Sequence, residues 1–226
     1  MKKIDSGEDY YNHNYHETLH KNLIEDNKYF ELRARASKDI IFKNIELSGK
    51  QILEYGCGIG HNISLINNAW GFDISKVARD SCKKRRINVF NEVSEINENA
   101  WDIILCSHVL EHLEEPLAHL KLFYNFLKIN GLLIIILPKE YHSKPKISSH
   151  FDINQHLYSW NFKTLSNLLN RAGFIVEKQR YRPVLGFKAL IPIYKIFGYD
   201  SYLFATKIIG FLYRNYWIMV YARKGP

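Results

Sequence analysis

ILEYGCGIGHNI, residues 52–63, places three glycines within five positions directly behind a short apolar run. The apolar run predicts a buried strand. Gly56, Gly58 and Gly60 would let the chain turn sharply and let a ligand approach its backbone. A helix that begins behind such a loop offers unpaired N–H groups, and ligands of open parallel sheets bind beyond the carboxyl ends of the strands. The stretch therefore predicts a nucleotide-like ligand at this strand end.

Short apolar runs and amphipathic patterns alternate along the chain on both sides of this stretch. Strands are predicted at residues 51–55, 70–74, 87–91, 101–107, 132–137 and 174–179. Helices are predicted at residues 28–45, 61–68, 75–86, 117–128 and 165–172, with Asn130-Gly131 and Gly173 as stop signals. Alternation of this kind favours one α/β domain with an open, mostly parallel sheet between helices.

Composition bounds the class of protein. The chain has 226 residues, 46% of them hydrophobic, which is typical of a globular domain and not of a disordered chain. A formal charge of +8 permits an anionic partner without choosing one. Three scattered cysteines and a polar N-terminus without an apolar segment predict a reduced, cytoplasmic protein.

Two acids narrow the choice of nucleotide. The dinucleotide fingerprint is GxGxxG, whereas GCGIGHN brings the third glycine one residue early. Glu54, just before the first glycine, would repel a pyrophosphate and attract an ammonium group. Asp73, at the end of the second strand, can accept both hydroxyls of a ribose. The pattern predicts a ligand with a ribose and an ammonium group but no phosphate, and it disfavours a nicotinamide oxidoreductase.

The ordered motifs then resemble one family. ILEYGCGIG and GFDIS resemble the first two motifs of class I S-adenosylmethionine-dependent methyltransferases. The segments WDIILCSHVLEHLEEPLAHL, LKINGLLIIILP and HFDINQHLYSWNFKTLSNLLNRAGF are similar to the later motifs of the small-molecule or glycan branch. The resemblance covers residues 29–180 and implies a Rossmann-like, seven-stranded, mostly parallel sheet with helices on both faces and an antiparallel last strand. Its usual Pro-Gly turn is Asn130-Gly131 here, and the adenine-contacting Asp stays unassigned.

The resemblance also implies a cofactor, S-adenosyl-L-methionine, and the residues that would hold it. The cofactor-binding positions fall on Tyr11, Arg33, Glu54, Gly56, Cys57, Gly58, Gly60, Asp73, Ile74, Ser107 and His108. Glu54 would lie near the amino group, Asp73 would bind the ribose, and Arg33 would pair with the carboxylate. Arg33 and Tyr11 have plain surface roles as alternatives, and the Cys57 side chain is expected to serve packing.

Domain boundaries follow from the alternation of strands and helices and from the two segments that lie outside it. Residues 1–226 form a single methyltransferase domain with an N-terminal helical cap at 1–48, a cofactor-binding core at 49–182 and a final strand at 215–226. Residues 183–214 are aromatic and apolar but interrupted by charges, so they predict no membrane span. This insertion is either extra core packing, a lid over the substrate, or a contact that makes the protein peripheral at an anionic membrane.

The reaction needs an acceptor aligned behind the methyl group and, for a hydroxyl acceptor, a base. His156, His150 and His112 are the candidates, in that order, because imidazole is neutral near pH 7. His112 has helix capping or loop packing as its alternative. A divalent ion held by Glu111, Glu114 and His112 is the less favoured hypothesis, and no metal is predicted.

The acceptor is predicted to be a small molecule, a sugar or glycan, or a lipid-linked compound, methylated at a hydroxyl. SHVL stands after the fourth strand, where enzymes that methylate base amino groups carry Asn/Asp-Pro-Pro-aromatic, so nucleic acid is disfavoured. Two alternatives stay open: an RNA methyltransferase, supported by the basic charge, and a non-catalytic S-adenosylmethionine-binding protein of the same fold.

Overall fold

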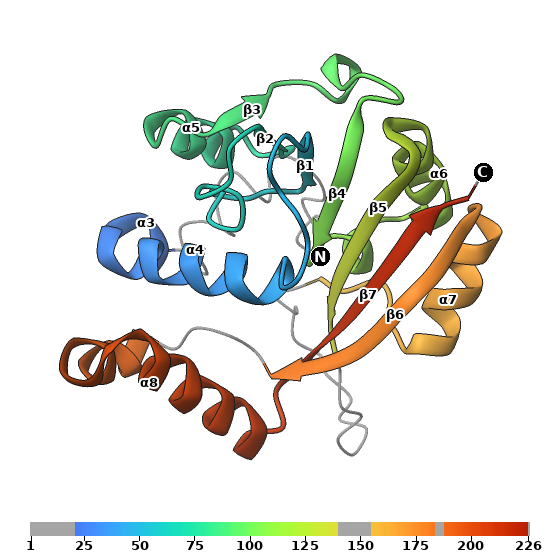
Figure 1. Cartoon of the computed structure of the whole chain (residues 1–226). Coiled ribbons are helices and arrows are strands. Elements are labelled where there is room, and N and C mark those ends of the chain that lie inside the picture. The colour runs from blue at the N-terminus through green and yellow to red at the C-terminus, as the bar shows by residue number, and fades with distance from the viewer. Residues whose placement is uncertain (1–20, 140–154, 184–187, 226) are drawn as a thin grey trace, which may run out of the picture.

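One seven-stranded sheet organises the computed structural model, which describes residues 21–139, 155–183 and 188–225 (Figure 1). The strands are β1 (Ile52–Tyr55), β2 (Ala69–Phe72), β3 (Asn88–Phe90), β4 (Trp101–Ser107), β5 (Leu127–Pro138), β6 (Phe174–Pro183) and β7 (Tyr216–Lys224). Their order is β3-β2-β1-β4-β5-β7-β6, and β7 runs antiparallel to both of its neighbours. This confirms the predicted Rossmann-like sheet with an antiparallel last strand.

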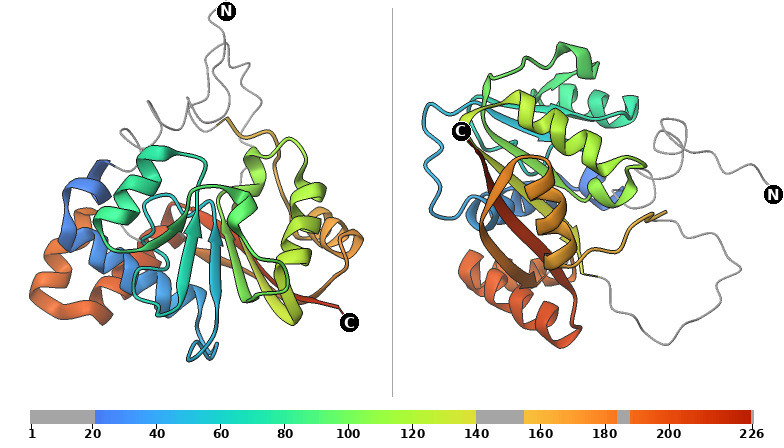
Figure 2. Two further views of the ribbon diagram at one scale, coloured as in Figure 1. Left: turned by 90° about the horizontal axis from the view of Figure 1, so that it is seen from above. Right: turned by 90° about the vertical axis from the view of Figure 1, so that its right-hand side faces the viewer.

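Helices cover both faces of the sheet. They are α3 (Lys21–Glu25), α4 (Asn27–Ile41), α5 (Lys76–Lys84), α6 (Pro116–Phe126), α7 (Phe162–Arg171) and α8 (Ile191–Leu212), with short 3-10 helices η2 (Val93–Glu95), η3 (Leu110–His112) and η4 (Lys188–Leu190). The buried side of α4 joins the core formed by Ile52, Leu105 and Ile134. On the opposite face, α6 and α7 pack over Leu53 and Ile104 (Figure 2).

The expected helix at residues 61–68 is wrong. The structure has a series of turns there, ending at Asn68 with φ of +57°. Three asparagines and a serine lie in this stretch, and such side chains compete for the backbone hydrogen bonds that a helix needs. Asn62 instead turns its amide inward toward Glu54.

The helix before β5 is shorter than its sequence pattern predicts. It ends at Phe126, and Leu127 already pairs with Trp101 in the sheet. Asn130, with φ of +61°, and Gly131 form an irregularity within β5 instead of a helix end. A Cβ on Gly131 would lie 2.8 Å from the Lys128 carbonyl oxygen, so a larger residue would displace this turn.

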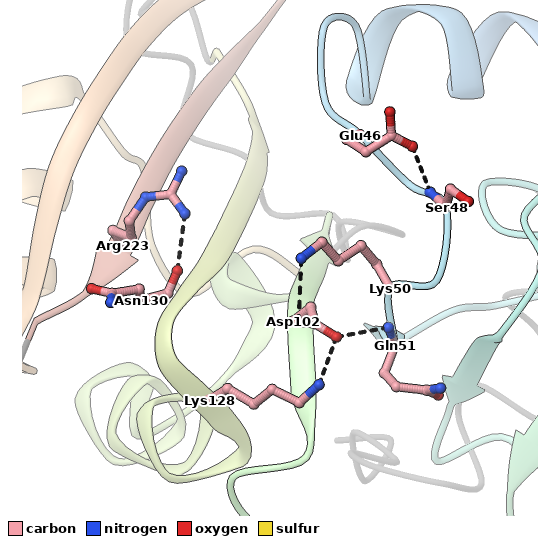
Figure 3. Close-up of polar contacts among 8 residues, drawn as sticks. All are labelled: Glu46, Ser48, Lys50, Gln51, Asp102, Lys128, Asn130 and Arg223. Carbon is pink, nitrogen blue, oxygen red and sulfur yellow. Dashed lines mark hydrogen bonds and ion pairs between the residues drawn. The ribbon is translucent and has the colours of Figure 1, made fainter.

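Polar contacts join the amino ends of the central strands (Figure 3). Asp102 on β4 accepts hydrogen bonds from the Gln51 backbone N–H at 2.9 Å and from Lys128 Nζ at 2.8 Å. Lys50 adds an ion pair at 3.7 Å. These contacts tie β1, β4 and β5 together at the edge opposite the glycine loop, so the carboxyl edge is left for a ligand.

The helix α8 lies on the outer side of α4, away from the sheet (Figures 1 and 2). Two of its buried residues, Tyr199 and Tyr202, pack with Leu32 in a separate small core. Tyr199 Oη also donates to Asp39 Oδ2 at 2.7 Å. Within the described ranges, none of the helices has both the length and the apolarity to cross a membrane.

Candidate active site

The glycine loop follows β1 and adopts a backbone that favours glycine. Gly56, Gly58 and Gly60 have φ of +74°, +52° and +78°. A Cβ on Gly56 would lie 2.2 Å from Val109 Cγ2, and one on Gly60 would lie 2.7 Å from Ile87 Cδ1. At these two positions the protein's own side chains fill the space that a Cβ would need, so packing requires glycine there. The close approach of a ligand to this backbone stays a prediction.

Asp73 organises this loop from the neighbouring strand. Its Oδ2 accepts a hydrogen bond of 2.7 Å from the Gly58 backbone N–H, and its Oδ1 accepts one of 2.9 Å from the Ser75 N–H. The carboxylate thus holds the loop after β1 against the start of α5. The contact of this carboxylate with the ribose hydroxyls stays a prediction.

Glu54 lies in the same place at the end of β1 and is only 1% exposed. Its Oε1 accepts a 2.6 Å hydrogen bond from Asn62 Nδ2, whereas its buried Oε2 has no hydrogen-bond partner among the described residues. Burial raises the pKa of this carboxyl to about 8, against the lowering effect of Asn62. A cation at Oε2 would supply the missing partner, so the residues present fit an ammonium group.

The next strand ends at Ser107, which pairs with Ile136 on β5 and is half-buried. His108 follows with φ of +57°, and its backbone N–H donates to the Ile136 carbonyl at 2.9 Å. Its ring lies 5.4 Å from the Trp217 ring, centroid to centroid. The strand pairing thus places Ser107 and His108 at the same sheet edge as Glu54.

A cluster of one acid and three histidines lies just beyond β4, at its end, in η3 and in the segment after residue 154. Glu111 is fully buried, and neither carboxylate oxygen has a hydrogen-bond partner among the described residues. His108 Nδ1 lies 3.4 Å and His112 Nε2 4.0 Å from Glu111 Oε1. The His112 and His156 rings are 5.0 Å apart.

Backbone bonds explain how His156 reaches this cluster. The carbonyl oxygen of Glu111 accepts hydrogen bonds from the N–H groups of Leu157 at 2.9 Å and Tyr158 at 3.3 Å. Tyr158 Oη donates to the Glu114 carbonyl at 3.0 Å. The segment that carries His156 is therefore fastened to the η3 turn by the two residues that follow this histidine.

The cluster can do two kinds of chemistry. Burial lowers the pKa of His112, so its imidazole is neutral at pH 7 and able to accept a proton. Glu111, His112 and His156 also offer ligand atoms within 4.8 Å of one another, a nitrogen and oxygen set that suits a divalent metal. Glu114, which the sequence-based metal hypothesis used, is not in this group.

The other predicted residues lie in varied surroundings. Cys57 is buried in the core, with its Sγ packed against Gly71, and Ile74 is 43% exposed. Arg33 lies on α4, close enough to Tyr202 of α8 to lower that group's pKa, which burial raises to about 12. Tyr11 and His150 fall outside the described residues. Their proposed roles stay predictions.

Two residues of the site escaped the sequence reasoning. Asn62 is 7% exposed and bonds Glu54, yet the stretch that contains it has the pattern of a short surface helix. Trp217 is 8% exposed and meets His108 across 109 residues of chain. For Asn62, the one signal in the sequence is an asparagine so close to the glycine loop. No local signal in the sequence points to Trp217.

The strand order, the glycine loop after β1 and the acids that end β1 and β2 define the class as a class I S-adenosylmethionine-dependent methyltransferase. A family model described as a methyltransferase domain matches residues 19–179, and the chain belongs to that family. The cofactor of the class is S-adenosylmethionine.

Similar proteins have been found by sequence and by structure. An uncharacterised protein of Methanocaldococcus jannaschii is 29% identical over 138 residues, which cover 55% of this chain and 61% of that protein. Phosphoethanolamine N-methyltransferase 2 of Haemonchus contortus shares the fold with a TM-score of 0.65 and 15% identity, over 100% of this chain and 62% of that chain. An S-adenosylmethionine-dependent methyltransferase of Thermotoga maritima aligns with a TM-score of 0.60 and 16% identity, over 96% and 99% of the two chains. The chain thus spans about three fifths of the length of the first two.

Proposed function

We propose that this enzyme transfers a methyl group from S-adenosylmethionine to a hydroxyl of a small-molecule, sugar or glycan, or lipid-linked acceptor. The observation that carries the proposal is the pairing of His112 with His156 at the carboxyl edge of the sheet, with buried Glu111 behind them. Neutral imidazole at this place suits removal of a hydroxyl proton at physiological pH.

When bound, S-adenosylmethionine supplies an electrophilic methyl carbon and a thioether leaving group. The acceptor hydroxyl gives its proton to an imidazole nitrogen as its oxygen forms the new bond to carbon. The cofactor would keep the electron pair of the bond that the methyl group leaves. Glu111 has a carboxylate oxygen within 4.8 Å of a ring nitrogen of both His112 and His156, so it would stabilise an imidazolium on either ring. His156 is favoured as the base and His112 as its partner, with His150 as a further candidate.

The cofactor residues are proposed on the geometry of the loop. Glu54 would bind the ammonium through Oε2, and the Asp73 carboxylate would accept hydrogen bonds from the ribose hydroxyls. The other proposed cofactor contacts come from Gly56, Gly58, Gly60, Ile74, Ser107, His108, Arg33 and Tyr11. Alignment of the acceptor by these elements can lower the barrier by about 7–11 kcal/mol, so the base is an addition to positioning and not the whole catalyst.

The proposal is tested by turnover against a panel of phenols, sugars and lipid-linked alcohols with isotope-labelled S-adenosylmethionine, with products identified by mass spectrometry. We expect O-methyl products, and a loss of about 10²–10⁴-fold in kcat for His156→Gln or for His112→Gln. His119→Gln is the matched control, because His119 lies on α6 and its ring contacts Tyr55 instead of this cluster.

Added zinc and a chelator distinguish general-base catalysis from metal catalysis. If a histidine acts as the general base, neither addition should change the rate of turnover. Normal adenosylhomocysteine binding without turnover on any acceptor would show the non-catalytic alternative. Methylation of RNA and of no other acceptor would show that the protein is an RNA methyltransferase. Full activity in both histidine variants would remove the role given to the cluster.

A further inference from the structure

A cavity of about 580 Å³ opens beyond the carboxyl end of β5, beside the ends of β6, β7 and α8. It is lined by Lys139, Tyr181, Phe211, Leu212, Arg214 and Tyr216. β4 and β5 are parallel and pair Ser107 with Ile136, so this cavity lies at the same sheet edge as the candidate active site. Of the described residues that line it, two are cations and none is an acid.

Contacts place the Lys139 side chain and the Arg214 backbone at the wall of the cavity. Lys139 Nζ lies 4.1 Å from the centroid of the Tyr181 ring, and the Lys139 backbone N–H donates to the Tyr216 carbonyl at 2.9 Å. Arg214 follows the end of α8 with φ of +52°, and its N–H donates to the Phe211 carbonyl at 3.1 Å. An ammonium and a guanidinium in one cavity favour a phosphate or carboxylate group.

An apolar strip leads away from these cations along α8. Phe211 and Leu212 are 66% and 69% exposed, and Phe204 and Ile208 continue the strip at 66% and 43%. These residues recur at intervals of three and four, on the side of the helix opposite buried Tyr202 and Thr206. A contiguous exposed apolar surface of this kind marks an interaction site.

We propose that the cavity binds an anionic amphiphile, with its charged head between Lys139 and Arg214 and its apolar chain along the strip formed by Phe204, Ile208, Phe211 and Leu212. The charge complementarity and the continuity of cavity and strip select this ligand over a purely apolar or purely ionic one. That the bound amphiphile is the methyl acceptor rests on the proposed function. A phosphorylated lipid in a bilayer and a free amphiphile share this chemistry.

Calorimetry with monomeric dodecyl phosphate tests the binding site on the full chain. We expect dodecyl phosphate to bind more tightly than inorganic phosphate and dodecyl maltoside. Lys139→Met and Arg214→Gln should each weaken it by about tenfold, the loss of one charge-assisted contact. Lys121→Met is the matched control, since it removes the same charge from an exposed position of α6, outside the cavity and away from the apolar strip. Melting temperatures identify any variant that fails to fold, and Arg214→Gln on the surface then carries the test.

Sedimentation with phosphatidylcholine vesicles, with and without phosphatidylglycerol, separates the two sources of ligand. Binding to the anionic vesicles that is reduced by Phe211→Ser would show that the ligand is a lipid in a bilayer. Binding of dodecyl phosphate without binding to vesicles would show that the ligand is a free amphiphile. Equal affinities for dodecyl phosphate and dodecyl maltoside, or equal losses in the Lys121→Met control, would overturn the inference. The affinity for adenosylhomocysteine is measured in the same experiments. A protein that does not bind adenosylhomocysteine would contradict the proposed function, whereas the amphiphile site depends only on the affinity for dodecyl phosphate.

Discussion

Glu54→Gln removes a buried carboxyl whose pKa burial raises to about 8 from a usual value near 4.5. Between these two pH values the folded protein holds a proton that the unfolded chain releases. Stability from this group is therefore fully present below about pH 4.5 and is lost as pH rises through about 8. At about 1.4 kcal/mol per pH unit, the whole loss is about 5 kcal/mol, an upper bound because a real interior relaxes around a charge.

Glutamine keeps the shape of the side chain but cannot ionise, so the variant lacks this pH-dependent loss. Urea unfolding followed by circular dichroism, at intervals from pH 5 to pH 9, gives the difference in unfolding free energy between the two proteins. We expect wild type to lose several kcal/mol relative to Glu54→Gln across this range. Glu46→Gln is the control, because Glu46 is exposed, and its difference from wild type should stay flat.

The same group links cofactor binding to pH. An ammonium at Oε2 favours the carboxylate, so binding of adenosylhomocysteine at pH 7 should release a proton and strengthen as pH rises toward 8. Calorimetry in buffers of different ionisation enthalpy measures the proton release. A Glu54→Gln curve parallel to wild type from pH 5 to 9, together with binding that releases no proton, would refute the reasoning about this carboxyl.

Two further changes test the packing around the site. Gly56→Ala should destabilise the protein by about 1–3 kcal/mol, because the new Cβ would meet Val109 and the φ of this residue is +74°. Urea unfolding measures this loss. Gly49→Ala, also at positive φ but in open space, should cost less. Tyr199→Phe removes the hydrogen bond to Asp39 and should cost about 1–2 kcal/mol, with faster hydrogen exchange in α8 than in β5; uniform exchange across both elements would contradict this.

Much of the fold could be predicted from residues 50–180 because burial follows each element's own period. The run LLIIIL forms the fully buried part of β5, and the glycines after β1 all take positive φ. The errors lie where side chains override local pattern. Asn62 bonds Glu54 across the loop, and Leu127 leaves its helix to pair with Trp101.

The sequence by itself determined the alternation of strands and helices, the glycine loop and the acids that end the first two strands, since each is a property of adjacent residues. Only the tertiary structure brought His156 to His112, Trp217 to His108, and Lys139, Tyr181 and Arg214 to one cavity. These partners come from segments far apart in the chain. Their meeting depends on the order of strands in the sheet and on where α8 docks, which no local periodicity encodes.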